Sequence, residues 1–431
     1  MKNFAKGAAA ALLVLLLASG ARAAAPIDIN EAVTLALKNN AQLRQLRQEL
    51  IKADAFKLAA DGTLLPSVSA SAAADKQREP QTTDGSDRSD NRNVKAMLEQ
   101  VIYSGGKNSA IRAQAPQVKS IARLALADGE NLTAGELYAR FYDVLLKKKQ
   151  IEAEESAVST SEMHLKQVRK MAELGLANRL DVIRAGQQLA TNTAALAMAR
   201  GMFETSQISL MNYMAIAPEE RREVAGALYT PAVSGDQSLS LAAAQQYRAD
   251  RMGLEEQLKY QANQIKIEKS GLLPKVTAGL SSGWANPYQR SDQSGDTWRA
   301  EITLAVPIFD RNVTQSAVIT AKAVREQNAI ALSQKNIDIK SEVASAWADI
   351  ETSRKSLAAS EKALELAKET LRLAQAGFRE GVTPQLDLLD AQSSLTATQL
   401  EYNRAQYNCL IAAVALRVTE GTAAEWNGDK N

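Results

Sequence analysis

One stretch decides the fold: Gly381-Val382-Thr383-Pro384-Gln385-Leu386-Asp387-Leu388-Leu389-Asp390-Ala391-Gln392. Residues 311–376, which precede it, have helical periodicity and contain no proline or glycine. Gly377 and Gly381 can take the left-handed conformation that ends a helix, and Pro384 suits the first turn of the next one. The stretch is therefore predicted to be the tip of a helical hairpin.

The same pattern occurs a second time, earlier in the chain. The segment Gly175-Leu176-Ala177-Asn178-Arg179-Leu180-Asp181 repeats the six-residue step from a glycine to an aspartate. In the later copy this step runs from Gly381 to Asp387. Two tips predict two structural repeats in one chain.

Composition favours long helices over compact domains. The chain has 431 residues, of which only 5% are aromatic and only 10 are proline. Alanine, leucine and long charged side chains dominate, and these residues favour helices.

The N-terminus is predicted to be a secretory signal peptide, residues 1–23. Lys2 and Lys6 supply the positive region, residues 8–18 the apolar region, and Ala21-Arg22-Ala23 the small-residue cleavage site. The apolar run is too short to span a membrane as a helix.

Several function classes are disfavoured by what the chain lacks. A formal net charge of +2 gives no basic excess to suggest nucleic acid. Cys409 is the single cysteine, so neither an intrachain disulfide nor a cysteine metal cage is expected. His164, the single histidine, is expected on a helix flank and leaves no Ser-His or Cys-His pair. We therefore expect no enzyme, no metal and no cofactor.

Each half of the chain shows one order of elements: helix, strand, loop, strand, long helix, tip, shorter helix. Leu-Leu-Pro ends the opening helix in both halves, at Pro66 and at Pro274. The first repeat is predicted at 24–217, with strands at about 66–74 and 93–103 and a tip at 175–181. The second repeat is predicted at 237–418, with strands at about 275–284 and 298–307 and a tip at 377–387. A connector in the equatorial region at 218–236 joins the repeats, and a polar tail follows at 419–431.

The four predicted strands have one apolar and one polar face. In the cleanest case Trp298, Ile302 and Leu304 alternate with polar residues. Amphipathic strands of about 10 residues in an exported chain suit an outer-membrane β-barrel. Trp284 and Trp298 flank one loop, where an aromatic girdle would lie. A pair of hairpins packed on the helices is the alternative.

The second long helix carries a seven-residue repeat. Its large positions pair with small ones three residues later, and the large positions are Val343, Ile350, Leu357, Leu364 and Leu371. Such a repeat predicts left-handed supercoiling, and each long helix would span roughly 100 Å. An ordinary coiled coil remains the alternative for this segment alone.

Four strands cannot close a barrel, because lipid tolerates no unpaired strand edge. Known single-chain barrels begin at about 8 strands, so several chains must contribute. Three copies would supply a 12-stranded barrel, with paired helical repeats forming a second, helical tube.

This order of elements resembles the TolC-type outer-membrane efflux protein family over nearly the whole mature chain. The matching parts are the opening helix at 27–40, both Leu-Leu-Pro segments, Pro307-Ile308-Phe309-Asp310 and both tips. The resemblance implies a homotrimer in outer-membrane lipid, whose α-helical barrel extends into the periplasm. It also implies a passive channel that works with a periplasmic adaptor (membrane fusion) protein and an inner-membrane transporter.

The resemblance gives two acidic residues a role at the periplasmic entrance. Asp387 and Asp390 occupy the positions at which inward-facing acidic residues constrict the channel in the family. A three-residue step puts both on one helix face, so three copies would form two rings of carboxylates. Alternatively, Asp387 is only a helix-start residue favoured by the helix dipole.

The resemblance also predicts that this entrance is latched differently. Some family members join a tyrosine and an arginine on the second tip to an aspartate on the first. Here the aspartate position is Asp181, but Phe378 and Thr383 replace the tyrosine and the arginine. Arg179 or Arg379 is a candidate substitute.

The predicted function is a passive outer-membrane export channel. A non-porous periplasmic coiled-coil adaptor or scaffold is the alternative, and it would need no amphipathic strands.

Overall fold

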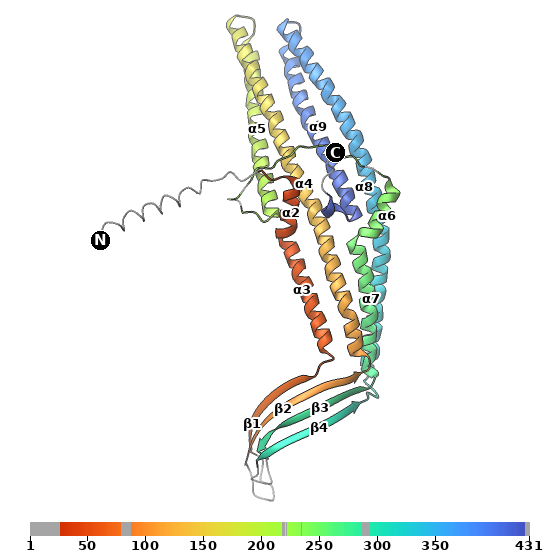
Figure 1. Cartoon of the computed structure of the whole chain (residues 1–431). Coiled ribbons are helices and arrows are strands. Elements are labelled where there is room, and N and C mark those ends of the chain that lie inside the picture. Colours follow the sequence, from red (N-terminus) through yellow and green to blue (C-terminus); the bar gives the residue numbers. More distant parts are fainter. Residues whose placement is uncertain are drawn as a thin grey trace, which may run out of the picture. The chain divides into compact units, whose positions relative to one another are not determined.

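The structure is a computed structural model, and it is mainly helical (Figure 1). It describes residues 26–78, 88–217, 220, 222–233, 235–286 and 294–426, so the predicted signal peptide lies outside the described part. The elements are α2 (Ile29–Asn39), α3 (Ala41–Gly62), β1 (Ser67–Arg78), β2 (Arg88–Ser104), α4 (Lys107–Glu173), α5 (Arg179–Tyr213), α6 (Gln237–Tyr247), α7 (Ala249–Lys269), η2 (Ser270–Leu272), β3 (Lys275–Asn286), β4 (Gly295–Ala305), α8 (Val313–Arg379), α9 (Gln385–Glu420) and η3 (Ala423–Glu425). In the described ranges, no helix is both long enough and apolar enough to cross a membrane.

The predicted two-repeat order is confirmed. Two helices, two strands, a long helix and a shorter helix occur as α2 to α5 and again as α6 to α9. Contacts divide the chain into two units, and α4 and α8 contribute residues to both. We call residues 45–127 and 249–338 the strand unit, and residues 1–44, 128–248 and 339–431 the hairpin unit.

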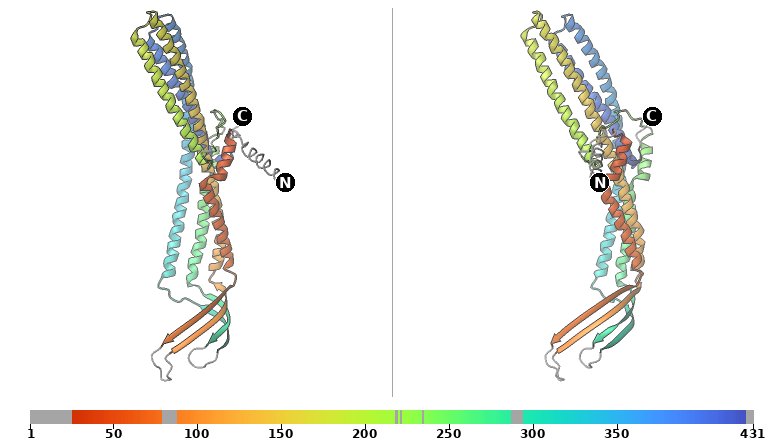
Figure 2. Two further views of the ribbon diagram at one scale, coloured as in Figure 1. Left: turned by 90° about the vertical axis from the view of Figure 1, so that its left-hand side faces the viewer. Right: turned by 60° about the vertical axis from the view of Figure 1, so that its left-hand side comes forward.

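The strand unit contains one antiparallel sheet in the order β1-β2-β3-β4, which Figure 2 shows as a curved ribbon of strands. Residues that pair across the ladder share a face, so the register confirms the predicted alternation. One row across the four strands is apolar: Val68, Leu98, Leu280 and Ala300. The next row, on the other face, is Ser67, Glu99, Gly279 and Glu301.

The strand bounds differ from the sequence-based ranges mainly in the first hairpin. β1 extends to Arg78 and β2 starts at Arg88, whereas the sequence predicted a loop over 76–93. Backbone pairing continues through this polar segment, for example between Asp75 and Asn91. Ladder hydrogen bonds use the main chain, so polar side chains do not end an antiparallel pair.

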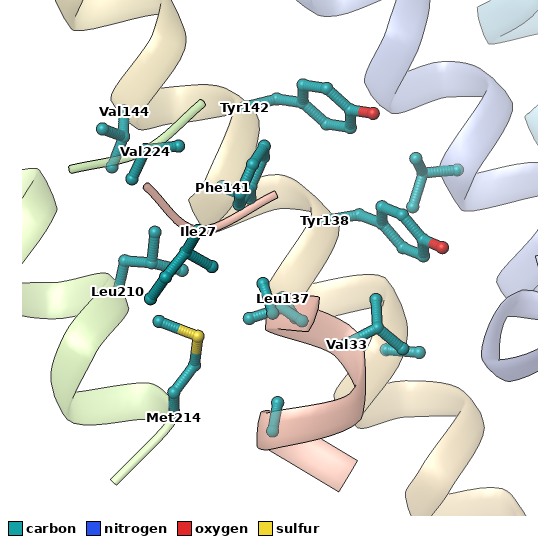
Figure 3. Close-up of a cluster of buried hydrophobic side chains, with 14 of the residues drawn as sticks. Ile27, Val33, Leu137, Tyr138, Phe141, Tyr142, Val144, Leu210, Met214 and Val224 are labelled. Atoms are coloured by element: carbon teal, nitrogen blue, oxygen red, sulfur yellow. The ribbon is translucent and has the colours of Figure 1, made fainter. Parts of the chain in front are cut away.

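The hairpin unit has its main apolar core where the segment around Ile27 meets α4 and α5. Ile27 is fully buried and forms a parallel bridge with Val224, which belongs to the predicted connector. Figure 3 shows Phe141, Leu210 and the bridge residues converging from different elements. Val224, Leu228 and Tyr229 of the predicted connector also contribute to this core.

The C-terminal segment differs from the predicted polar tail. α9 continues to Glu420, and Gly421 ends it in the left-handed conformation at φ 83°. The chain then turns back, so that Ala423 and Trp426 are buried in the same core. The sequence-based prediction relied on the polar composition of this segment and so missed the two apolar residues, Ala423 and Trp426, that are buried.

The seven-residue seam of α8 packs as the sequence predicted. Val343, Ile350 and Leu364 are buried, and Ile350 lies in a cluster with Leu416 of α9. α4 likewise approaches α9 closely, because a Cβ at Gly135 would lie 2.3 Å from a methyl carbon of Val418. Small residues at such points let helix backbones lie close together.

Candidate functional site

The first tip is a tightly capped turn in the hairpin unit. Gly175 has φ 73°, and the Leu176 N–H donates to the Met171 oxygen at 2.8 Å, which closes α4 in a Schellman motif. Asn178 and Asp181 then form a capping box at the start of α5. The Asp181 carboxylate accepts the Asn178 N–H at 3.1 Å, so it is engaged within its own turn.

The second tip repeats the Schellman motif. Gly381 has φ 78°, and the Val382 N–H donates to the Gly377 oxygen at 2.9 Å. Gly377 itself stays helical, unlike the turn glycine that the sequence predicted. A Cβ there would lie 2.2 Å from the Thr383 hydroxyl oxygen, so this glycine makes room for the returning chain.

Pro384 prevents Asp387 from forming a capping box. It lies at the N-cap of α9, one position before the first turn in which it was predicted, and it makes no side-chain cap. In the first tip, Asn178 offers its N–H to Asp181, but a proline has no N–H to offer. Asp387, the counterpart of Asp181, therefore cannot form a capping box.

Asp387 and Asp390 are both exposed, while the intervening Leu388 and Leu389 are buried. Among the described residues neither carboxylate has a hydrogen-bond or ion-pair partner. Two exposed carboxylates on one face of α9 can attract cations and repel one another.

A buried polar contact joins the two tips. The Gln385 amide nitrogen donates to the backbone oxygen of Asp181 at 2.9 Å and lies 3.3 Å from Nε2 of His164. Phe378 packs edge-on against the His164 ring, with centroids 5.4 Å apart. Burial lowers the pKa of His164. The contact thus links α4 and α5 to α8 and α9.

The candidate substitutes for the family latch are placed elsewhere. Arg179 and Arg379 are exposed, at the first residue of α5 and the last of α8. In the described part of the subunit, neither forms an ion pair with Asp181. Phe378 reaches the first hairpin through His164 and not through Asp181.

On two strands the polar face of the sheet carries a basic residue followed by an acidic one. Lys95 precedes Glu99 on β2, and Arg299 precedes Glu301 on β4. Gly279 pairs with both glutamates, and the Glu301 side chain lies 3.3 Å from where a Cβ of Gly279 would be. Trp284 and Trp298 share the opposite face as diagonal neighbours, since Trp298 pairs with Ser282.

Comparison with known proteins decides the family. The model of the outer membrane efflux protein family matches residues 32–215 and 237–422. The chain belongs to the outer membrane efflux protein family. The two matched segments coincide with the two repeats, which confirms the resemblance seen in the sequence.

Individual relatives of this outer membrane efflux protein are distant in sequence and close in fold. The outer membrane efflux protein BepC of Brucella suis is 24% identical over 95% of this chain and 88% of BepC. The CmeC outer membrane channel of Campylobacter jejuni superposes with a TM-score of 0.81 at 15% identity, over 94% of this chain and 87% of CmeC. VceC of Vibrio cholerae gives a TM-score of 0.77 at 16% identity, over 91% and 96%.

Family membership gives the protein its location and class. It is an outer-membrane export channel protein that extends into the periplasm, and its relatives are channels and not enzymes. Among the residues that the structure describes, no group of three or more acidic, histidine or cysteine side chains could hold a metal ion.

In this outer membrane efflux protein the sequence analysis did not identify Gln385 as a site residue, and it expected His164 only on a helix flank. Both lie on buried helical stripes, Gln385 with Leu388 and Leu389, and His164 with Leu165 and Val168. A polar residue in line with buried apolar ones at helical spacing was the available signal.

Proposed function

We propose that three copies of this chain form a passive export duct. Their sheets would pair edge to edge in the outer membrane, and their helices would form a tube in the periplasm. The observation that carries this proposal is the sheet itself. β1 and β4 each pair on one side only, in the described part of the chain, and the apolar face is bare, with Trp298 79% exposed.

A free strand edge beside an exposed apolar face is unstable both in water and in lipid. Pairing β4 of one subunit with β1 of the next removes every edge. It also turns the apolar face toward lipid and the polar face, with Lys95 and Glu301, toward a water-filled lumen.

Asp387 and Asp390 would constrict the periplasmic entrance of this duct. Both carboxylates are exposed, and neither has a partner in the described part of the subunit, as a ring facing a shared axis requires. Three copies would bring six negative charges together, which favours cations at the entrance. Trp284 and Trp298 would contribute to the aromatic girdle of the barrel.

The duct itself supplies no energy, so we further propose that it works with an inner-membrane transporter and a periplasmic adaptor. A groove of about 810 Å³ between α4, α5, α8 and α9 offers such a helical partner a surface. Gln188, Asn192 and Gln399 are among the polar residues that line it.

Purification from outer membranes tests the proposal directly. We expect a trimer after chemical cross-linking in detergent, and stable single-channel currents after its insertion into planar bilayers. A water-soluble periplasmic monomer without channel activity would instead support a non-porous scaffold.

A further inference from the structure

The orientation of the Gln385 side chain is fixed by its neighbours. The side chain is 8% exposed, and one of its terminal atoms lies 2.9 Å from the backbone oxygen of Asp181. A carbonyl oxygen only accepts hydrogen bonds, so this atom must be the amide nitrogen. The same nitrogen lies 3.3 Å from Nε2 of His164. That ring nitrogen must therefore be an acceptor, and the imidazole proton must be on Nδ1.

This arrangement exists only with a neutral imidazole. Protonation places an N–H on Nε2 of His164, so that two donors face each other. Rotating the amide by half a turn would offer its oxygen to the imidazolium. The same rotation would turn the amide N–H away from the backbone oxygen of Asp181. Either response breaks one of the bonds between the hairpins. Among the described residues the buried Gln385 oxygen has no hydrogen-bond partner, so these surroundings offer the amide no third arrangement.

We propose that Gln385 and His164 form a clasp between the two tips that closes when His164 is neutral and opens when it is protonated. Gln385 is the first residue of α9, so the clasp positions the turn that carries Asp387. These two are positioning residues, since both are buried and act through the turn that carries Asp387. The inference rests on the export channel proposed above.

The charged side chains on the helices that surround His164 are either engaged elsewhere or exposed, so the protonation of His164 determines the state of the clasp. On α5, the Asp181 carboxylate is engaged with Asn178. On α8, on α9 and in the turn between them, Arg379, Asp387 and Glu380 are exposed. On α4 itself, Glu162, Lys166 and Lys170 are exposed as well. Burial lowers the pKa of His164, so the clasp is closed at neutral pH and opens in acid.

The single histidine makes the clasp directly observable. In the trimer labelled with ¹³C,¹⁵N-histidine, the NMR spectrum contains one imidazole, that of His164. We expect the Nδ1-protonated tautomer at pH 7.5 and a titration midpoint below the ordinary value of about 6.5. A proton found on Nε2 at pH 7.5 would overturn the clasp.

Channel recordings test its consequence. Wild-type conductance should rise in one step on acidification, with the midpoint found by NMR. In H164Q the new amide oxygen accepts the same Gln385 N–H at every pH, so conductance at pH 7.5 should be retained and this step lost. H164A and Q385A should show the raised conductance already at pH 7.5. Because Asp387 and Asp390 are unchanged in all four proteins, a difference between the proteins reports on the clasp.

Two results would overturn the clasp. The first is an acid-induced conductance step of wild-type size in H164Q. The second is a Q385A conductance equal to that of the wild type both at pH 7.5 and in acid. Absence of any channel from the wild-type protein would instead overturn the proposed function.

Discussion

The Trp426 ring lies on Tyr138, with centroids 4.8 Å apart and planes inclined by 57°, and the Tyr138 hydroxyl donates a hydrogen bond to the Trp426 backbone oxygen. Asn131 holds the same segment from α4. Its amide donates to the Val418 oxygen at 2.9 Å, and its side-chain oxygen accepts the Ala423 N–H at 2.8 Å. The segment from Val418 to Trp426 is thus an integral part of the core.

Replacing Trp426 by alanine should therefore destabilise the hairpin unit. The loss of a buried aromatic side chain typically costs about 3–5 kcal/mol. Tyr138→Phe is the matched variant, since it removes only the hydroxyl and should cost about 1 kcal/mol. Thermal unfolding followed by circular dichroism measures both. An unchanged midpoint for W426A would show that the C-terminal segment does not support the core.

The elements that the sequence predicted well are those set by local patterns. The alternation of Trp298, Ile302 and Leu304 and the glycine turns at Gly175 and Gly381 follow from rules that act within a few residues. The contact between Gln385 and His164 does not, because it depends on how two hairpins align. Trp426 was missed for a related reason: a short polar segment can be anchored by one apolar side chain whose partner is distant in sequence.

Gly135 should be intolerant of a side chain. A Cβ there would lie 2.3 Å from a Val418 methyl carbon, so Gly135→Ala forces α4 and α9 apart, at a cost of about 1–3 kcal/mol. Gly186 provides the control, since a Cβ there would meet no atom of the subunit within 4 Å. Gly186→Ala should stabilise α5 by up to about 1 kcal/mol through helix propensity. Equal unfolding midpoints for the two variants would refute the close approach.

Gly283 should matter for assembly of the sheet. A Cβ there would lie 2.2 Å from the Val94 backbone oxygen and 2.7 Å from Cα of Lys95, so Gly283→Ala must displace β2 from β3. We expect a cost of about 1–3 kcal/mol and a smaller fraction of cross-linked trimer in outer membranes. Gly295→Ala, where the new methyl group meets no atom of the described residues within 4 Å, should assemble like the wild type. Normal assembly of G283A would contradict the register at this point.

Asp387 and Asp390 should set the ion preference of the entrance. The double variant D387N/D390N removes six charges per trimer, so the cation-to-anion permeability ratio should fall severalfold. The difference should shrink in strong salt, because the screening length falls from about 10 Å at 0.1 M to about 3 Å at 1 M. Reversal potentials across a salt gradient provide the measurement. Unchanged conductance and ion preference would exclude the carboxylate rings.

The lumen of the proposed barrel should rectify current independently of the entrance. β2 and β4 both end just before a long helix, and on each the basic residue comes first and the acidic residue nearer that helix: Lys95 then Glu99, and Arg299 then Glu301. Three copies would place a ring of basic charge from Lys95 and Arg299 next to a ring of acidic charge from Glu99 and Glu301, and the acidic ring lies nearer the long helices. Asp75 and Lys275 lie on the same face further out, at the loop end and at the helix end. A pore charged in this way gathers ions under one polarity of voltage and loses them under the other, so the two currents differ.

E99Q/E301Q should reduce the asymmetry in planar bilayers at 0.1 M salt. Ser69→Ala, an uncharged change on the same face, should leave it intact. Because these side chains belong to the strands and not to the tips, D387N/D390N should preserve the rectification. Symmetric currents in the wild type, or rectification that survives E99Q/E301Q, would show that the order of charges along the strands does not control ion flow.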